Sequence, residues 1–167
     1  MKVPHETIER LRAGMEKAAA PYSKKESALL AVLHAVQDIL GWIPPDAEEA
    51  VADYLGVGAN RVHEVVSFYS MFRTSPRGIW HLRVCATLSC DICGAGGLVE
   101  VIRGKTGLSS GQVTSDGIFS FEEVECLGAC DLSPAIQVNE EPAQGPVTPE
   151  SLGALLDRLR RKGAEIA

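Results

Sequence analysis

Glu125-Cys126-Leu127-Gly128-Ala129-Cys130 is the stretch of sequence that decides how the rest of the chain is interpreted. Its two cysteines are separated by a Leu-Gly-Ala turn. A second pair, Cys85 and Cys90, lies upstream with four residues between its members. Two close cysteine pairs in one chain are typical of a metal or iron–sulfur site. A fifth cysteine, Cys93, follows the upstream pair, and every interpretation must account for it.

The composition is that of an acidic globular protein. Of the 167 residues 46% are hydrophobic and 23% are charged, and the formal net charge is −6. This charge argues against a nucleic-acid partner, because phosphate binding needs a basic face. Residues 1–6 are not expected to belong to a signal peptide, and the most apolar segment, residues 28–40, is expected to be too short to span a bilayer. We expect a cytoplasmic chain without direct membrane insertion, in which cysteines serve metal or redox chemistry.

The first part of the chain has the periodicity of amphipathic helices. One helix is predicted to open at a capping box, Ser23 to Glu26, and to end at Gly41. Asn60 is a predicted N-cap for a later helix. None of these helices carries residues at catalytic spacing. We expect a four-helix unit over residues 1–74.

After a linker at residues 74–78, the helical periodicity gives way to the alternation of strands. Thr148-Pro149-Glu150 predicts a helix start, because a cap, a first-turn proline and an acid occur together, and Gly163 is predicted to end that helix. The chain is therefore expected to be α+β, with a small α/β domain over residues 79–167. Its predicted elements are a strand at 79–84, a helix at 98–106, strands at 119–124 and 135–138, and a helix from 149.

One interpretation of the cysteines is a [2Fe–2S] cluster held by Cys85, Cys90, Cys126 and Cys130. Iron and sulfide are soft enough to prefer thiolates, and four thiolates complete two tetrahedral irons. Each close pair would bind one iron. Gly128 would let the backbone bend so that both sulfurs of its pair face one way, and it would expose amide N–H groups that can donate to cluster sulfurs.

Three other interpretations remain open on spacing alone. Cys85, Cys90 and Cys93 match the spacing of plant-type ferredoxins, whose fourth ligand lies far downstream. Cys90 and Cys93 also form a Cys-x-x-Cys motif of the kind used by thiol–disulfide oxidoreductases. A structural zinc site on four thiolates is the third possibility. The plant-type interpretation gives no role to one of Cys126 and Cys130, and the thiol–disulfide interpretation gives no role to either. A cluster held by the two pairs leaves only Cys93 without a role.

Other residues give weaker signals. Gly94-Ala95-Gly96-Gly97 lacks the third glycine of a dinucleotide fingerprint, because position 99 is Val, so the chain shows no nucleotide site. His34 is predicted to be a partly buried structural residue, and no histidine lies at ligand spacing from a cysteine. Three aromatic residues at helical spacing are predicted to be core or to contact a partner: Phe68, Tyr69 and Phe72.

The cysteine motifs occur together with five segments that carry a family pattern: Gln37-Asp38-Ile39-Leu40-Gly41-Trp42-Ile43-Pro44, Val66-Ser67-Phe68-Tyr69-Ser70-Met71-Phe72, Val113-Thr114-Ser115-Asp116-Gly117, Ser133-Pro134-Ala135-Ile136-Gln137-Val138-Asn139 and Val147-Thr148-Pro149-Glu150. With them the chain resembles the thioredoxin-like [2Fe–2S] ferredoxins. Within that family it most resembles the peripheral thioredoxin-like subunits of bacterial NADH:quinone oxidoreductase. This enzyme is the NADH dehydrogenase known as respiratory complex I. The resemblance covers nearly the whole chain.

This resemblance implies a four-helix N-terminal unit followed by a thioredoxin-like α/β domain. It implies that one [2Fe–2S] cluster is bound through its iron by Cys85, Cys90, Cys126 and Cys130. Cys93 would then be a bystander near the cluster loop. Pro134 falls where thioredoxin-like folds commonly place a cis proline.

The function that the resemblance implies is electron transfer within an oxidoreductase, with no stand-alone active site on this chain. The cluster would exchange electrons with the flavin of a partner, the flavin-binding subunit of the NADH-oxidising module, which would carry FMN and oxidise NADH. The complex would hold the chain at the periphery of the inner membrane. The same resemblance fits the diaphorase part of an NAD-linked hydrogenase or formate dehydrogenase. Alternatives of another class are a thiol–disulfide oxidoreductase using Cys90 and Cys93 and a zinc-stapled interaction module.

Overall fold

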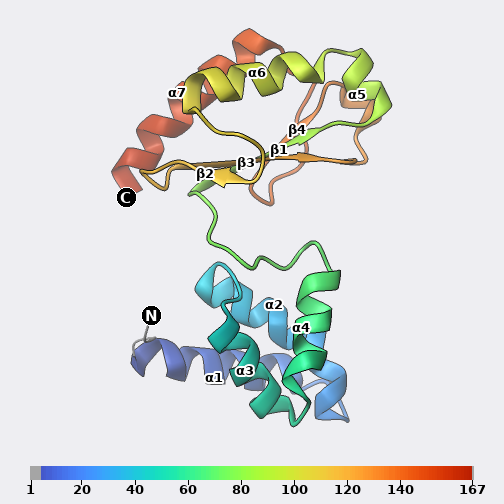
Figure 1. Ribbon diagram of the computed structural model, residues 1–167, viewed down its shortest axis with the longest axis vertical. Helices are drawn as coiled ribbons and strands as arrows, with labels where there is room; N and C mark the ends of the chain where they lie inside the picture. The colour runs from blue at the N-terminus through green and yellow to red at the C-terminus, as the bar shows by residue number, and fades with distance from the viewer. Residues whose placement is uncertain (1–4, 167) are drawn as a thin grey trace. The chain divides into compact units, whose positions relative to one another are not determined.

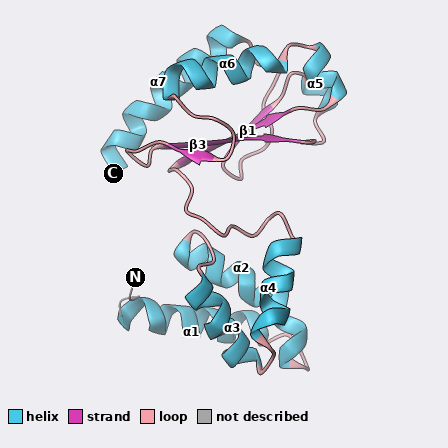
Figure 2. Ribbon diagram, viewed as in Figure 1, coloured by secondary structure: helices cyan, strands magenta, loops and turns pink. Residues whose placement is uncertain are grey.

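The computed structural model describes residues 5–166 of the chain, which form two compact units (Figure 1). One unit ends at Pro76 and the other begins at Arg77. The first is helical, and the second combines helices with a sheet (Figure 2). The expected α+β class is therefore confirmed. In residues 5–166, no helix combines the length and the apolar character that crossing a membrane would require.

The helical unit contains the four α-helices that the periodicity predicted, and a short 3₁₀ helix, η1. Their apolar faces enclose a core in which Val32, Leu33, Ile43 and Val51 have no exposed surface. Burying side chains of this kind stabilises the fold by roughly 1.5–3 kcal/mol each. The elements are α1 (His5–Ala19), η1 (Lys25–Ala28), α2 (Leu29–Leu40), α3 (Pro45–Leu55) and α4 (Ala59–Phe68).

Two predicted helix starts are wrong. The predicted capping box leads into η1, whose N-cap is Lys24 and which has no side-chain cap bond. The N–H of Ser27 donates to the carbonyl of Lys24 at 3.0 Å, a backbone bond that belongs to the 3₁₀ turn, and α2 begins only at Leu29. α4 begins at Ala59, and Asn60 therefore lies inside the helix rather than at its cap.

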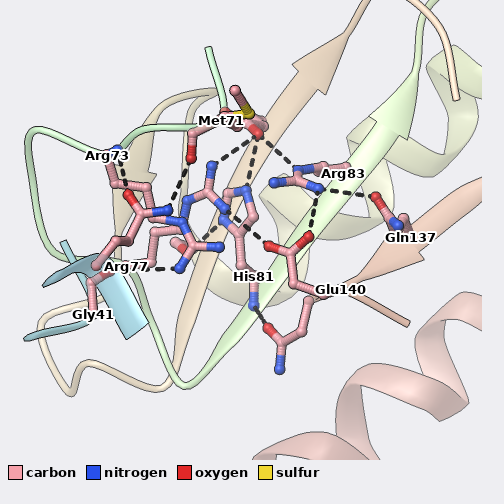
Figure 3. Close-up of polar contacts among 12 residues, drawn as sticks. Gly41, Met71, Arg73, Arg77, His81, Arg83, Gln137 and Glu140 are labelled. Carbon is pink, nitrogen blue, oxygen red and sulfur yellow. Dashed lines mark hydrogen bonds and ion pairs between the residues drawn. The ribbon is translucent and has the colours of Figure 1, made fainter. Parts of the chain in front are cut away.

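A buried amide fixes the path of the chain after α4. Gln37 donates from Nε2 to the carbonyl of Met71 at 2.9 Å and accepts the backbone N–H of Arg73 at 2.7 Å (Figure 3). The guanidinium of Arg73 donates to the carbonyl of Gly41 at 3.4 Å. Gly41 ends α2 as predicted, with a φ of 82° that suits glycine.

The aromatic residues around the end of α4 fall into different environments. Phe72 is buried in the core, whereas Phe68 is 80% exposed and Tyr69 is 36% exposed. His34 is exposed rather than partly buried, with its ring centroid 5.0 Å from that of Phe72. The helical spacing predicted Phe68, Tyr69 and Phe72 to be core or partner contacts. Only Phe72 is core, and α4 ends at Phe68, so the predicted helical period does not extend to Phe72.

The second unit is built on a four-stranded sheet in the order β2-β3-β1-β4. β1 and β3 are parallel, and β2 and β4 are antiparallel neighbours at the two edges. A parallel pair needs a crossover, which here contains α6. The elements are β1 (Trp80–Cys85), α5 (Leu88–Ile92), α6 (Ala95–Thr106), β2 (Gln112–Val113), β3 (Phe119–Val124), η2 (Cys130–Leu132), β4 (Ile136–Val138) and α7 (Pro149–Ile166).

The core of this unit lies between the sheet and the helices α6 and α7, which run along one face of the sheet (Figure 1). Leu82 of β1, Phe119 and Phe121 of β3, Ile102 of α6 and Leu152 of α7 have no exposed surface. The alternation of strand residues sends these side chains to one face. The other face of β1 and β3 carries polar residues.

The predicted order of strands and helices is confirmed, with three additions: α5, β2 and the 3₁₀ helix η2. The sequence pattern did not predict α5 or β2, because five and two residues are too few to establish a period. Thr148 caps α7 as predicted: its hydroxyl oxygen accepts the N–H of Ser151 at 3.2 Å. The main helices and strands, and the short strand β4, were therefore predictable, whereas the short elements next to the cysteine motifs and at the edge of the sheet were not.

The predicted end of α7 is wrong, because the helix passes through Gly163 and continues to Ile166. A Cβ added at Gly163 would lie 2.7 Å from Cγ2 of Ile118. The glycine therefore allows the helix to approach the sheet closely. Nearby, the indole N–H of Trp80 donates to the carbonyl of Leu159 at 2.9 Å, which ties β1 to α7.

Candidate metal centre

The parallel pairing of β1 and β3 brings the two cysteine motifs to one edge of the sheet. Cys85, the last residue of β1, is in register with Val124, the last residue of β3. The carboxyl ends of parallel strands meet at one edge, where ligands commonly bind in α/β folds. The α5 segment and the 125–133 segment both begin there (Figure 1). Motifs that are far apart in sequence are thus neighbours in space.

The upstream cysteine pair is buried. Cys85 is 4% exposed and Cys90, within α5, is 2% exposed. The thiol of Cys85 donates to the carbonyl of Glu125 at 3.8 Å. Because Glu125 directly precedes Cys126, this contact joins the upstream pair to the downstream motif.

Hydrogen bonds favour the ionised form of Cys85. Burial raises the pKa of its thiol, but hydrogen bonds with the backbone of Thr87 and Leu127 and with the side chains of Cys90 and Thr87 outweigh burial and lower the pKa. The thiolate is the form that binds metal. Leu127 belongs to the downstream motif, so both segments act on the same sulfur.

The downstream cysteine pair is exposed. Cys126 and Cys130 both reach the surface, on a segment with little regular structure. Gly128 has a φ of 69°, which favours glycine, and its N–H donates to Sγ of Cys126 at 3.2 Å. The bend at Gly128 and the N–H group directed at sulfur both agree with the expectation from sequence.

Ser133 connects the two pairs. Its hydroxyl donates to the carbonyl of Cys130 at 2.8 Å, and the same oxygen lies 3.5 Å from Sγ of Cys90. The peptide bond between Ser133 and Pro134 is cis, as the resemblance led us to expect. The N–H of Cys85 donates to the carbonyl of Ala135 at 3.2 Å. The segment that follows the downstream pair therefore lies against the upstream pair.

The chemistry of the donor set, four thiols in two pairs on adjacent segments, fits an iron–sulfur cluster. Among the side chains that the structure describes, no three or more of His, Cys, Asp or Glu are grouped as one metal ion would need. A structural zinc site takes four protein ligands on one ion. In a [2Fe–2S] cluster each iron takes only two thiolates, because bridging sulfides supply its other two ligands. Two thiol pairs on adjacent segments, with N–H groups near two of their sulfurs, supply that number of thiolates.

Cys93 differs from the other four cysteines in its position. It is the C-cap residue of α5 and is exposed, and its backbone N–H donates to the carbonyl of Ser89 at 3.2 Å. All five cysteines of the chain are free thiols. The Cys90-x-x-Cys93 motif thus contains one buried thiol and one exposed thiol.

A polar network ties together the two strands that present the cysteines (Figure 3). His81 lies 2.7 Å from the hydroxyl of Ser120 through Nδ1 and 3.0 Å from a carboxylate oxygen of Glu122 through Nε2. Arg83 and Arg77 donate to the same oxygen of Glu122 at 3.1 and 3.4 Å. The hydrogen bond from His81, with the two guanidinium groups, lowers the pKa of Glu122 to about 2, and burial lowers the pKa of His81.

The sequence did not single out Ser133, Thr87 or Glu122. The position of Ser133, three residues after Cys130 and directly before a proline, was a signal that could have been used. Thr87 carried a weaker signal, as a hydroxyl residue between two predicted ligands. No spacing rule points to Glu122, because its partners come from another strand and from the segment before β1.

Comparison with known families gives a match over most of the chain. The family model for thioredoxin-like [2Fe-2S] ferredoxins matches residues 15–160. The chain belongs to this family. The expected thioredoxin-like character of the C-terminal fold and the resemblance to the family are confirmed.

Curated relatives carry the name of one enzyme complex. NADH-quinone oxidoreductase subunit 2 of Thermus thermophilus is 43% identical over 143 residues, which are 86% of this chain and 79% of the relative. A protein of Rhizobium meliloti that is also named as an NADH-quinone oxidoreductase subunit is 37% identical over 150 residues, which are 90% of this chain and 89% of the relative. The resemblance to the thioredoxin-like subunit of that oxidoreductase is therefore confirmed.

A solved structure shares the fold. The NAD+-reducing [NiFe]-hydrogenase in its air-oxidized state matches with a TM-score of 0.70 and 19% identity over 80% of this chain. The match covers 23% of that longer hydrogenase chain. At this identity the similarity is one of fold.

Proposed function

We propose that this chain is the peripheral thioredoxin-like subunit of an NADH:quinone oxidoreductase and that Cys85, Cys90, Cys126 and Cys130 hold one [2Fe–2S] cluster. The observation that carries the proposal is the meeting of two cysteine pairs at the carboxyl edge of β1 and β3, in a member of a [2Fe–2S] ferredoxin family. Such a cluster, when bound, supplies one-electron transfer. The relatives named as subunits of that oxidoreductase support the choice of complex.

The residues around the sulfurs have separate roles in this proposal. Burial of Cys85 and Cys90 excludes water from one side of the site. The exposed Cys126 and Cys130 leave the other side open to a partner. The N–H groups of Gly128 and Leu127 stabilise negative charge on sulfur. The site is thus enclosed on one side and accessible on the other, as electron exchange with a second protein requires.

The partner in this proposal is the flavin-binding subunit of the NADH-oxidising module, which would carry FMN and bind NADH. The glycine segment of this chain serves the fold instead. Gly94 is the N-cap of α6 with a φ of 94°, and Val99 is buried inside that helix, so the segment turns the chain between α5 and α6. Association with the flavin-binding partner would keep the chain at the periphery of the inner membrane. Cys93 is proposed to be a bystander.

A second candidate is the diaphorase part of an NAD-linked hydrogenase. The shared fold with an NAD+-reducing [NiFe]-hydrogenase favours it, but the sequence relatives at 37% and 43% identity favour the oxidoreductase. Purification from the native source decides between them. Co-purification with the other oxidoreductase subunits is expected, and co-purification with a hydrogenase would replace the first candidate.

The cluster is tested by anaerobic purification, assay of iron and acid-labile sulfide, and EPR after reduction. We expect iron and sulfide in equal amounts, corresponding to one [2Fe–2S] cluster per chain, and the EPR signal of a reduced cluster. Colourless protein with stoichiometric zinc would contradict the proposal. Protein without metal, with a redox-active disulfide between Cys90 and Cys93, would favour the thiol–disulfide alternative.

A further inference from the structure

Ser133 lies in direct contact with both cysteine pairs. Its oxygen is 3.5 Å from Sγ of Cys90, a distance at which a hydroxyl and a sulfur can share a hydrogen, and either atom can donate. The same hydroxyl donates to the carbonyl of Cys130 at 2.8 Å. A hydroxyl has one hydrogen to donate and two lone pairs to accept. The thiol of Cys90 can therefore donate to Ser133 while Ser133 donates to Cys130.

The backbone on each side of Ser133 is held in place. On one side, a Cβ added at Gly145 would run into the carbonyl oxygen of Leu132, so these two backbone segments are in close contact. On the other side, the N–H of Val147 donates to the carbonyl of Pro134 at 3.0 Å. These contacts hold the backbone around Ser133, and the bond to the carbonyl of Cys130 holds its hydroxyl beside Cys90.

Binding a cluster changes which groups can donate. A cysteine loses its proton when it binds metal, so the sulfur of Cys90 would become an acceptor only. The hydrogen of Ser133 then has two possible acceptors, the carbonyl of Cys130 and the sulfur of Cys90. A bond to the charged sulfur is the stronger one, because hydrogen bonds to ionised groups are roughly twice as strong as those between neutral groups.

We propose that Ser133 is a positioning residue that donates a hydrogen bond to the sulfur of Cys90 and thereby raises the reduction potential of the cluster. The inference rests on the proposed function, because it takes Cys90 as a ligand. Reduction adds one electron and so one negative charge to the cluster and its sulfurs. A donor to sulfur stabilises the more negative state more, so it favours the reduced form.

The test compares Ser133→Ala with Ser89→Ala in the purified, cluster-loaded full chain. Ser89 is an exposed serine next to the same cysteine and provides the matched control. The readouts are iron content and the midpoint potential from an EPR-monitored redox titration. We expect Ser133→Ala to keep its iron and to have a more negative midpoint potential. At the wild-type midpoint its reduced-to-oxidised ratio should fall on the order of tenfold, which is about 59 mV for one electron. Ser89→Ala should match the wild type.

A second pair of variants distinguishes the effect of the hydroxyl group from the effect of side-chain shape. Threonine at position 133 keeps the hydroxyl, and valine has a similar shape without it. We expect Ser133→Thr to restore a potential near that of the wild type and Ser133→Val to match Ser133→Ala. If Ser133→Ala assembles its cluster poorly, the comparison of Ser133→Thr with Ser133→Val still tests the role of the hydroxyl.

Two results would overturn the inference while leaving the proposed function intact. One is equal midpoint potentials in the variants with and without the hydroxyl. The other is loss of iron from both Ser133→Ala and Ser133→Val with retention in Ser133→Thr, which would make Ser133 an assembly residue rather than one that sets the potential. A wild-type chain that holds no cluster would instead remove the proposed function itself.

Discussion

The two cysteine segments meet at one edge of the sheet, but they differ in burial and regularity. The upstream segment, residues 85–93, ends a central strand and continues as a helix, and its first two cysteines are within the core. The downstream segment, residues 125–133, has only a 3₁₀ helix, and its cysteines are exposed. One segment is part of the packed body of the unit, and the other lies over it.

This difference teaches that ligands of one cluster can have unequal roles in the fold. A buried thiol is also a small apolar core group, so removing it affects packing as well as metal binding. An exposed thiol contributes little to packing. The same Cys→Ser substitution should therefore have a larger total effect in the upstream segment, and this expectation can be tested.

The largest effect is expected for Cys90→Ser. The substitution removes a proposed ligand and also places a more polar hydroxyl at a position that is 2% exposed. We expect loss of the cluster signal and, in metal-free protein, a decrease in the free energy of unfolding of about 1–3 kcal/mol. Iron assay and urea unfolding of the metal-free protein measure the two effects. Iron content equal to wild type would show that Cys90 is not a ligand.

The next largest effect is expected for Cys130→Ser, which removes a proposed ligand from the exposed segment. The cluster should be lost or greatly altered, and the loaded C-terminal unit should lose the stability that metal binding adds. The metal-free protein should unfold within about 0.5 kcal/mol of the wild type, because surface substitutions usually do. Equal destabilisation of metal-free Cys90→Ser and Cys130→Ser would abolish the contrast between the segments.

Acid is expected to weaken the polar network of His81 and Glu122, which joins the strands that precede the two cysteine segments. The pKa of Glu122 is held at about 2, below its ordinary value of 4.5, so its carboxylate stabilises the fold above pH 4.5 and this contribution is lost as pH falls toward 2. The pKa of His81 is lowered, so the folded state binds its proton less readily and stability declines as pH falls below 6.5. With allowance for solvent screening at a carboxylate that is 33% exposed, we expect a loss on the order of 1–2 kcal/mol.

Urea unfolding of the metal-free protein between pH 7 and pH 3 measures this loss. Glu122→Gln is the matched control, and its stability should be lower at pH 7 and should change less with pH. An unchanged pH dependence in Glu122→Gln would show that other carboxylates cause the acid effect.

The smallest effect is expected for Cys93→Ser. Cys93 is exposed at the end of α5 and is the cysteine that the paired ligand set leaves over. The EPR spectrum, the iron content and the free energy of unfolding should match those of the wild type. A lost cluster would restore the plant-type ligand set, in which Cys93 takes the place of one downstream cysteine.

Much of this fold could be predicted from sequence because its long elements have clear periods. The helix from Leu29 and the strands around Leu82 and Phe121 follow from the alternation or recurrence of apolar residues. The helix starts were less predictable, since the residues of the predicted capping box lead into a 3₁₀ turn with no side-chain cap bond. Gly163 has the residue type of a helix stop, but its role is to let α7 pack closely.

The candidate site was predictable only as far as its cysteines. The spacing of the cysteines can be counted in the sequence. Their burial depends on where the strands end relative to the core, which the spacing does not show. Ser133 contacts Cys90 across 43 positions of sequence, and Glu122 contacts Arg83 across 39. Such contacts arise from the register of β1 with β3 and from the return of the chain past Pro134, which no local pattern encodes.

The hydrogen bond from the indole of Trp80 to α7 makes this side chain an optical reporter. The chain has two tryptophans, Trp42 in the helical unit and Trp80 in the sheet unit. Because Trp80 bridges β1 and α7, its fluorescence changes when that helix leaves the sheet, whereas Trp42 reports on the helical unit. The tryptophan emission of a Trp42→Phe protein would therefore come from the sheet unit alone, and the melting of that unit could be recorded separately in the intact chain.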